Sequence, residues 1–241
     1  QAMLWHAGVQ TVLPPGYLCC GYPQRGSGQF DKAEKMITDN RVLFHRVATT
    51  LNYLDIKTVV VSCGTCYDQL ATYQFDKIFP GSRLIDIHEF LLEKGITLEG
   101  AGGYLFHVPC HDPMKLQDPM KTVKALIGDN VIEAKRCCGE SGTLGVTRPD
   151  IATQVRFRKE EELRANEAAL RASGAVAAHG PVKVLTSCPS CSLARSVAET
   201  ISLTVNTGSV STTTGEPCNT NSPSSTSTLP RPLASVSSLR R

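Results

Sequence analysis

The chain has 241 residues, of which 41% are hydrophobic and 20% charged, and its formal net charge is +3. So small a charge argues against a protein that binds nucleic acid or an acidic membrane surface by electrostatics. No apolar stretch approaches the roughly 20 residues of a transmembrane helix, and residues 1–10 lack the features of a secretory signal. The length allows one large domain or two domains of ordinary size.

The first strong pattern along the chain predicts a long helix, followed by a strand and a second helix. Five apolar residues at three- to four-residue spacing form one stripe: Met36, Leu43, Val47, Leu51 and Leu54. The β-branched run KTVVVSC predicts a short buried strand that ends at Cys63, and YDQLATYQF predicts the helix after it. SRLIDI predicts a further strand.

The second half of the chain has the same alternation of strands and helices. GGYLFHV and NVIEA predict strands, and Pro149 suits the first turn of a long helix that contains KEEELRANEAALRA. We expect the charged residues from Lys159 to Arg164 to form a solvated face. VKVLTSC predicts a strand that ends at Cys188, followed by the helix SLARSVAET. This alternation is typical of an α/β fold whose parallel sheets are covered by helices on both sides.

An internal repeat divides the chain. The CCG at residues 19–21 returns at residues 137–139, and the CxxC at residues 63–66 returns at residues 188–191. We therefore predict two pseudo-equivalent α/β units, which meet near residue 100 at LEGAGG.

The predicted units cover residues 1–99 and 100–201, and a different composition follows them. Residues 202–241 are rich in Ser, Thr and Pro without sustained periodicity. Such a segment cannot bury enough apolar surface to offset its chain entropy, so we predict a disordered tail. Cys218 lies in this tail, and we leave it out of the site.

The grouping of the ten cysteines indicates metal or redox chemistry in a reducing compartment, because a chain of this size folds without disulfide staples. A CxxC between a strand and a helix places both sulfurs near free backbone N–H groups, and the helix dipole there favours thiolate. Iron–sulfur clusters, zinc and redox disulfides all use thiolates. The CxxC motifs alone therefore leave these three alternatives open.

The paired cysteines favour a metal cluster. Neighbouring side chains diverge, so two consecutive sulfurs can reach different metal atoms of one centre, while Gly21 and Gly139 let the main chain turn tightly and approach an inorganic body. The second unit offers five thiols, more than one tetrahedral zinc uses: Cys110, Cys137, Cys138, Cys188 and Cys191. The first unit offers four, enough for zinc or an ordinary cluster: Cys19, Cys20, Cys63 and Cys66.

Three motifs, HVPCHDP, CCGESGTLG and SCPSC, together with the first CCG and CxxC, resemble the CCG, or cysteine-rich, domain family over about residues 1–200. This family includes the B subunit of heterodisulfide reductase and the iron–sulfur subunits of glycolate oxidase, lactate oxidation and anaerobic glycerol-3-phosphate dehydrogenase systems. The resemblance implies a 4Fe–4S-type cluster, cubane or non-cubane, on the five cysteines of the second unit, and iron or zinc on the four of the first.

The chain is also similar, at GYLCCGYPQRGSGQ, to the C-terminal region of large bacterial flavin-linked oxidoreductases. The counterpart of Cys110 in the first unit would precede Gln1, so we expect that unit to be truncated at its N-terminus. The resemblance implies FAD on an absent domain or a partner subunit, a ferredoxin-like domain, and a quinone or other electron acceptor. It implies a cytoplasmic location, or a peripheral one at the inner face of a bacterial membrane.

The leading functional prediction is an electron-transfer module of a flavin-dependent oxidoreductase that acts on a 2-hydroxy acid such as D-lactate or glycolate. Two alternatives stay open: a catalytic cluster domain like that of heterodisulfide reductase, and a zinc-stabilised binding module. No catalytic residue is predicted. His107 and His111 flank Cys110, and we expect them to form hydrogen bonds behind the centre rather than to act as ligands.

Overall fold

A computed structural model of the chain describes residues 1–16, 18–98, 102–140, 144–177 and 179–192. The predicted tail with Cys218, the predicted helix beyond Ser192 and residues 99–101 at the predicted boundary lie outside these ranges, so these expectations stay predictions. Helices alternate with parallel strands through the described residues, which confirms the α/β class. None of the described helices has the length and apolar character needed to cross a membrane.

The first half builds a two-stranded parallel sheet. Its elements are α1 (Ala2–His6), α2 (Tyr22–Gly26), α3 (Phe30–Thr50), β1 (Thr58–Val61), α4 (Gly64–Ala71), α5 (Phe75–Ile78), β2 (Arg83–Asp86) and α6 (Ile87–Glu93). The register pairs Val60 with Ile85. Both predicted strands are therefore present, and the predicted helix after the CxxC is divided into α4 and α5.

The long helix α3 is confirmed, but its packing face is rotated from the predicted stripe, of which Val47 packs against the core. Ala33, Ile37 and Asn40 are its buried residues, whereas Met36 and Leu43 are only half-buried. Asn40 interrupts the apolar pattern because its amide donates to the Cys19 carbonyl at 2.7 Å and to a tyrosine hydroxyl at 3.0 Å. A polar side chain in the packing face thus hid that face from a search for apolar periodicity.

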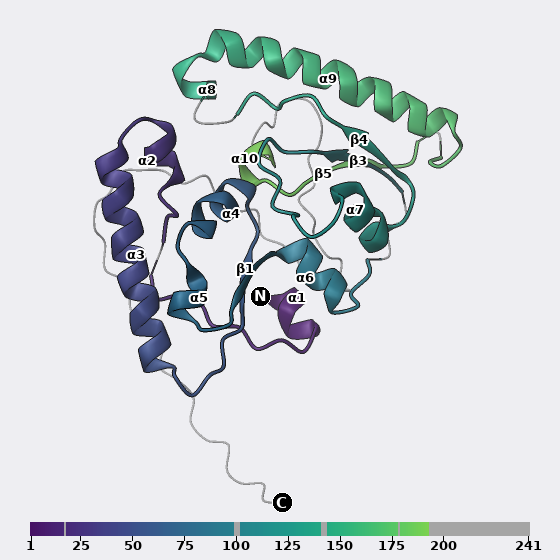
Figure 1. Ribbon diagram of the computed structural model, residues 1–241. Helices are drawn as coiled ribbons and strands as arrows, with labels where there is room; N and C mark the ends of the chain where they lie inside the picture. The colour runs from purple at the N-terminus through teal and green to yellow at the C-terminus, as the bar shows by residue number, and fades with distance from the viewer. Residues whose placement is uncertain (17, 99–101, 141–143, 178, 193–241) are drawn as a thin grey trace, which may run out of the picture. The chain divides into compact units, whose positions relative to one another are not determined.

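The second half builds a three-stranded parallel sheet in the order β4-β3-β5. Its elements are β3 (Gly103–His107), α7 (Pro119–Ile127), β4 (Val131–Ala134), α8 (Leu144–Thr147), α9 (Pro149–Ala172), β5 (Val182–Thr186) and α10 (Pro189–Ser192). All five residues of β3 are buried. Tyr104 and Phe106 point into one core and Leu105 into another, as the alternation of a central strand requires. Figure 1 shows α9 and α7 on opposite sides of this sheet.

Helix α6 joins the two halves through a shared core. Leu91 of α6 packs with Phe106 of β3 and Leu126 of α7 in one hydrophobic cluster, although α6 follows directly from β2 of the first sheet. The partly buried Ile87 and Leu92 pack against the same cluster. The two repeats are therefore not separated by a solvated linker at this point.

Both CCG motifs use their glycine in the same way. Gly21 and Gly139 adopt left-handed backbone conformations with φ of 89° and 79°. A Cβ at Gly21 would lie 3.4 Å from the carbonyl oxygen of Ala33 in α3, and one at Gly139 would lie 3.0 Å from that of Ala152 in α9. The tight turn was predicted. The close neighbour is the backbone of the following long helix.

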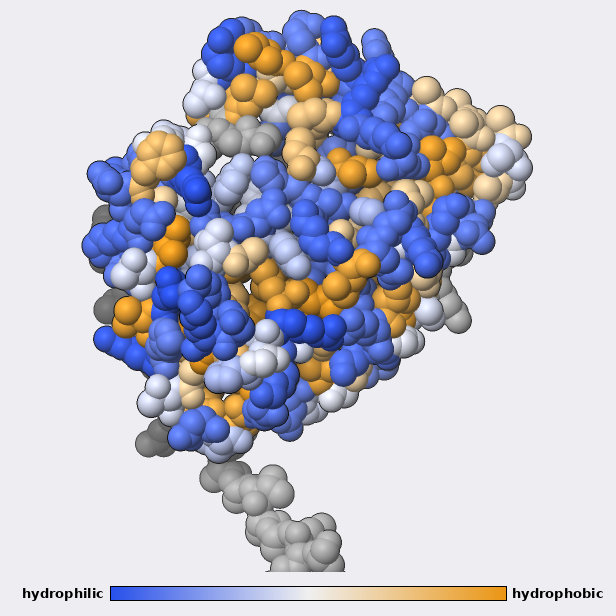
Figure 2. Space-filling view, viewed as in Figure 1, coloured by the Kyte–Doolittle hydropathy of each residue, from blue (hydrophilic) through white to orange (hydrophobic). Residues whose placement is uncertain are grey.

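The expected solvated face from Lys159 to Arg164 is wrong at its first residue. The Lys159 side chain is buried, and its ammonium group donates to the Ala134 carbonyl at 2.9 Å and pairs with Glu162 at 2.8 Å. The long alkyl stem allows this charge to cross the packing face and still find partners. Figure 2 shows hydrophilic residues over the middle of α9 and hydrophobic residues gathered over α8 and the start of α9.

Replacing Gly139 by alanine tests whether the close packing of this turn against α9 contributes to stability. A left-handed alanine costs about 1–2 kcal/mol, and the close approach to Ala152 adds to this cost. Gly174 has a similar φ of 74°, and a Cβ there would meet no atom within 4 Å, so Gly174→Ala measures the backbone cost alone. We expect urea unfolding to show a larger loss of stability for Gly139→Ala. Equal losses would show that the contact with α9 contributes nothing.

Candidate metal centre

Both CxxC turns lie where a strand ends and a helix begins. Cys63 follows β1 as the extended N-cap residue of α4, and the backbone N–H of Cys66 donates to its sulfur. Cys188 follows β5 in the same way, and the N–H of Cys191 donates to the sulfur of Cys188. These N–H groups stabilise thiolate over thiol. The parallel strands thus deliver both turns with the geometry that the sequence predicts.

The sulfurs of the two halves meet. The thiols of Cys63 and Cys188 lie close enough to shift each other's pKa, although these residues belong to different repeats. Figure 1 shows α4 and α10, the helices that follow these cysteines, next to each other at the centre of the view. Contacts continue outward from this pair through both halves. The result is a continuous inner sulfur chain, formed in order by Cys20, Cys66, Cys63, Cys188, Cys191 and Cys138.

Each adjacent pair of cysteines diverges. Cys20 and Cys138 are buried and join the inner sulfur chain, whereas Cys137 is exposed with its sulfur 4.0 Å from that of Cys110. The Cys19 sulfur lies 3.9 Å from the side-chain oxygen of Gln24. We call Cys110 and Cys137 the outer pair. The two sulfurs of each CC step therefore lie in different surroundings, and this divergence is what the sequence predicts.

The separation of the outer pair fits two ligands of one metal atom, and the sulfurs of Cys138 and Cys191 lie closer together. Two thiolates on one tetrahedral ion, each at about 2.3 Å, lie about 3.8 Å apart. The outer pair is separated by 4.0 Å, and the sulfurs of Cys138 and Cys191 by 3.2 Å. All nine cysteines of the described residues are free thiols, and a disulfide would require a far shorter distance.

The pKa values show why thiols alone do not satisfy this arrangement. Contact with Cys191 and then the neighbouring His107 lower the pKa of Cys138 to about 5, and contact with Cys66 lowers that of Cys20 to about 7. The pKa of Cys191 is raised, because Cys138 and Cys188 beside it favour its protonated form. Only some of the sulfurs can ionise together. Metal cations remove this conflict, and soft thiolates are the donors that iron and zinc take.

A three-residue clamp closes the first half on the second. His111, next to Cys110, contacts the Tyr22 hydroxyl through Nε2 at 3.2 Å and the Asp68 carboxylate through Nδ1 at 2.6 Å. Tyr22 follows the first CCG and Asp68 lies in α4 after the first CxxC. Gly64 adds a steric condition, because a Cβ there would overlap the backbone carbonyl of His111. Each cysteine motif of the first half thus touches the loop after Cys110.

A buried carboxylate also holds the loop after Cys110. Glu89 of α6 is 2% exposed and accepts the backbone N–H groups of Lys115, Leu116 and Gln117 at 3.3, 2.8 and 3.2 Å. Three donors satisfy a buried carboxylate that would otherwise be strongly unfavourable. The sequence patterns gave no signal for Glu89, which is hidden inside an otherwise ordinary helix.

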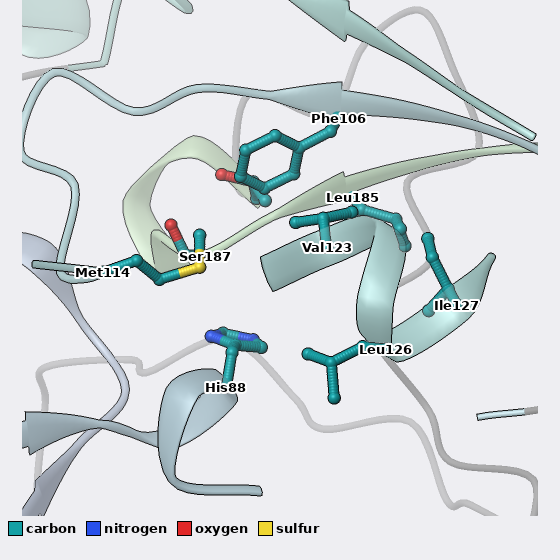
Figure 3. Close-up of a pocket in the computed structure, with 9 residues that line it drawn as sticks. His88, Phe106, Met114, Val123, Leu126, Ile127, Leu185 and Ser187 are labelled. Carbon is teal, nitrogen blue, oxygen red and sulfur yellow. The ribbon is translucent and has the colours of Figure 1, made fainter. Parts of the chain in front are cut away.

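A small cavity lies beneath the second CxxC. His88 points into it from α6, with Met114 and Ser187 on the opposite side, as Figure 3 shows. Its volume is about 10 Å³, which is room for about one water molecule. The Ser187 hydroxyl is buried without a hydrogen-bond partner among the described residues. This cavity is far too small for a flavin or an organic acid.

His107 lies closer to the sulfurs than the sequence patterns suggest. Its ring nitrogen and the sulfurs of Cys138 and Cys191 all lie within 4.8 Å of one another. The other flanking histidine, His111, forms hydrogen bonds as expected. The only hint in the sequence was the position of His107 at the end of a fully apolar strand.

Comparison with known proteins assigns the chain to a family. The cysteine-rich domain (CCG) family matches residues 2–71 and 104–194, two regions that together contain every cysteine of the inner sulfur chain and the outer pair. The chain belongs to this family, as its motifs predicted. No solved structure matches it.

Several curated proteins are similar to most of the described residues. The B subunit of the fumarate reductase (CoM/CoB) of Methanothermobacter marburgensis is 30% identical over 65% of this chain and 32% of its own length. Lactate utilization protein A of Oceanobacillus iheyensis is 24% identical over 69% of this chain and 72% of its own. A probable glycolate oxidase iron–sulfur subunit of Bacillus subtilis is 23% identical over 70% and 41%. The chain thus spans about a third of the length of the methanogen protein.

Replacing Gly64 by alanine tests whether the clamp holds the halves together. Gly64 opens α4 and has an ordinary φ, and alanine is the better helix former by about 1 kcal/mol. We nevertheless expect Gly64→Ala to lower the urea midpoint, because the new methyl group displaces His111. Gly26→Ala in α2 is the control, since its Cβ would meet only Tyr22 at 3.7 Å. A stability gain in Gly64→Ala would contradict the clamp.

Proposed function

We propose that the chain is an iron–sulfur electron-transfer module of an oxidoreductase. The observation that carries this proposal is the inner sulfur chain, in which the CCG and CxxC motifs of both repeats converge on one region. An iron–sulfur cluster supplies one-electron transfer when it is bound. The residues of this chain hold the cluster, exclude water from its inner side and leave its outer side accessible at Cys110 and Cys137.

The second half holds the principal centre in this proposal. Its ligands are Cys110, Cys137, Cys138, Cys188 and Cys191, and five thiolates suit a 4Fe–4S-type cluster better than a single zinc ion. The four cysteines of the first half, Cys19, Cys20, Cys63 and Cys66, hold iron or zinc. The relatives named for iron–sulfur function support iron in at least one of these sites.

The electrons come from a flavin on another domain or subunit. The relatives named for lactate and glycolate suggest a 2-hydroxy acid as the reductant of that flavin. A ferredoxin-like domain passes the electrons to this module, and a quinone or another carrier accepts them. We place the protein in the cytoplasm, at the inner face of the membrane where the acceptor is a quinone.

A second candidate function is reduction of a disulfide at the centre itself. The exposed outer pair favours it, because a substrate sulfur can approach Cys110 and Cys137 from solvent, as does similarity to the methanogen fumarate reductase named for CoM and CoB. Two electrons and two protons would convert one disulfide into two thiols. Anaerobic turnover of a disulfide by the chemically reduced chain separates this candidate from simple electron transfer.

Metal analysis of the anaerobically purified full chain tests the proposal. We expect a brown protein with iron and acid-labile sulfide, and we expect Cys138→Ala to lose much of that iron because Cys138 links both parts of the second centre. Cys218→Ala is the matched control, since Cys218 belongs to neither motif. Unchanged iron and an unchanged EPR spectrum in Cys138→Ala would contradict the assignment. A colourless protein that contains only zinc would favour a binding module.

A further inference from the structure

His107 is a buried imidazole at the last position of the central strand β3. The residue is 3% exposed, and the strand register pairs it with Ala134 of β4. The Nδ1 atom lies 3.4 Å from the carbonyl oxygen of Ala134. A carbonyl oxygen only accepts hydrogen bonds, so Nδ1 carries the ring proton in this arrangement.

With the proton on Nδ1, the second ring nitrogen carries a lone pair, and a proton or a metal ion on that nitrogen would lie beside Cys138, whose pKa His107 lowers. Nε2 of His107 is fully buried and has no hydrogen-bond partner among the described residues. One ring nitrogen of His107 and the sulfurs of Cys138 and Cys191 lie within 4.8 Å of one another. Because Nδ1 is directed at the Ala134 carbonyl, Nε2 is the ring nitrogen that remains for these sulfurs. A buried nitrogen without a partner needs an explanation, and a bound metal ion would use this lone pair.

We propose that Nε2 of His107 is a direct ligand of the metal centre that Cys138 and Cys191 hold. This inference rests on the proposed iron–sulfur function and deepens it, because it adds a nitrogen donor to a set that the sequence presents as thiolate only. The imidazole comes from β3, whereas the two cysteines come from the segments after β4 and β5. The three strands of the second sheet therefore each contribute a ligand.

The hydrogen bond of Nδ1 resembles the one that orients a metal-ligating histidine. A ligating imidazole usually donates its other N–H to a carbonyl or carboxylate, which fixes the tautomer and the ring orientation. Ala134 provides this carbonyl, and Lys159 of α9 donates to the same oxygen at 2.9 Å. Lys159 in turn pairs with Glu162. A positioning chain thus runs from α9 through Ala134 to the ring.

A nitrogen ligand has a measurable redox consequence. A neutral imidazole gives the centre less negative charge than a thiolate does, and iron–sulfur centres with histidine ligands have higher reduction potentials than those with cysteine alone. His107→Cys replaces the imidazole by a thiolate at the same position. We therefore expect this variant to bind iron and to show a lower reduction potential.

Pulsed EPR of the full chain tests the ligand directly. The protein is loaded with iron anaerobically, brought to its paramagnetic state and prepared with natural histidine or with histidine labelled with ¹⁵N in the imidazole ring. We expect strong ¹⁴N coupling that changes to ¹⁵N coupling on labelling. His107→Ala should lose this coupling, and His45→Ala should retain it, because the His45 side chain is exposed on α3.

The outcomes separate the inference from the proposed function. Iron-loaded protein without strong imidazole coupling would overturn the ligand assignment and leave the iron–sulfur function intact, as would coupling that persists in His107→Ala. The labelled, unsubstituted protein gives this result even if His107→Ala fails to fold. An unchanged reduction potential in iron-loaded His107→Cys would also overturn the assignment. Absence of iron from the unsubstituted chain would overturn the proposed function itself.

Discussion

The contact between the sulfurs of Cys63 and Cys188 is the interaction on which the rest of the structure depends. Each sulfur sits at the carboxyl end of a parallel strand, in a turn whose N–H groups favour thiolate. Two neighbouring thiolates repel each other away from water, so a proton or a cation between them favours this arrangement. The fold therefore concentrates negative charge at one place, and a metal centre relieves the repulsion.

The protein around the sulfurs keeps the two repeats from moving apart. Helix α6 shares its apolar face with the second sheet, and Glu89 on the same helix binds three backbone N–H groups of the loop after Cys110. His111 in that loop reaches back to Tyr22 and Asp68 of the first half. The loop after Cys110 thus makes three kinds of contact. Its backbone binds the Glu89 carboxylate, its His111 ring binds Tyr22 and Asp68, and its backbone packs against Gly64. These contacts hold the loop after Cys110 against both halves.

The sequence predicts the individual strands and helices well, but it predicts the contacts between the two halves poorly. β-Branched runs ending in cysteine predict β1 and β5, and the CCG repeat predicts the diverging pairs. Patterns of single residues carry no information on distant partners, so they indicated a solvated Lys159 and a misplaced packing face for α3, where Asn40 is buried. The position of His107 beside Cys138 depends on the β3–β4 register, which only the folded sheet supplies.

The central claim is that both repeats build one electronically connected centre or pair of centres. Its most direct test is the EPR spectrum of the reduced, iron-loaded chain in Cys63→Ser. The component that Cys138→Ala removes identifies the centre of the second half. If the inner sulfur chain is continuous, Cys63→Ser must shift or broaden that component, because Cys63 touches Cys188. A component of the second half that is identical in Cys63→Ser and the unsubstituted protein would contradict the claim.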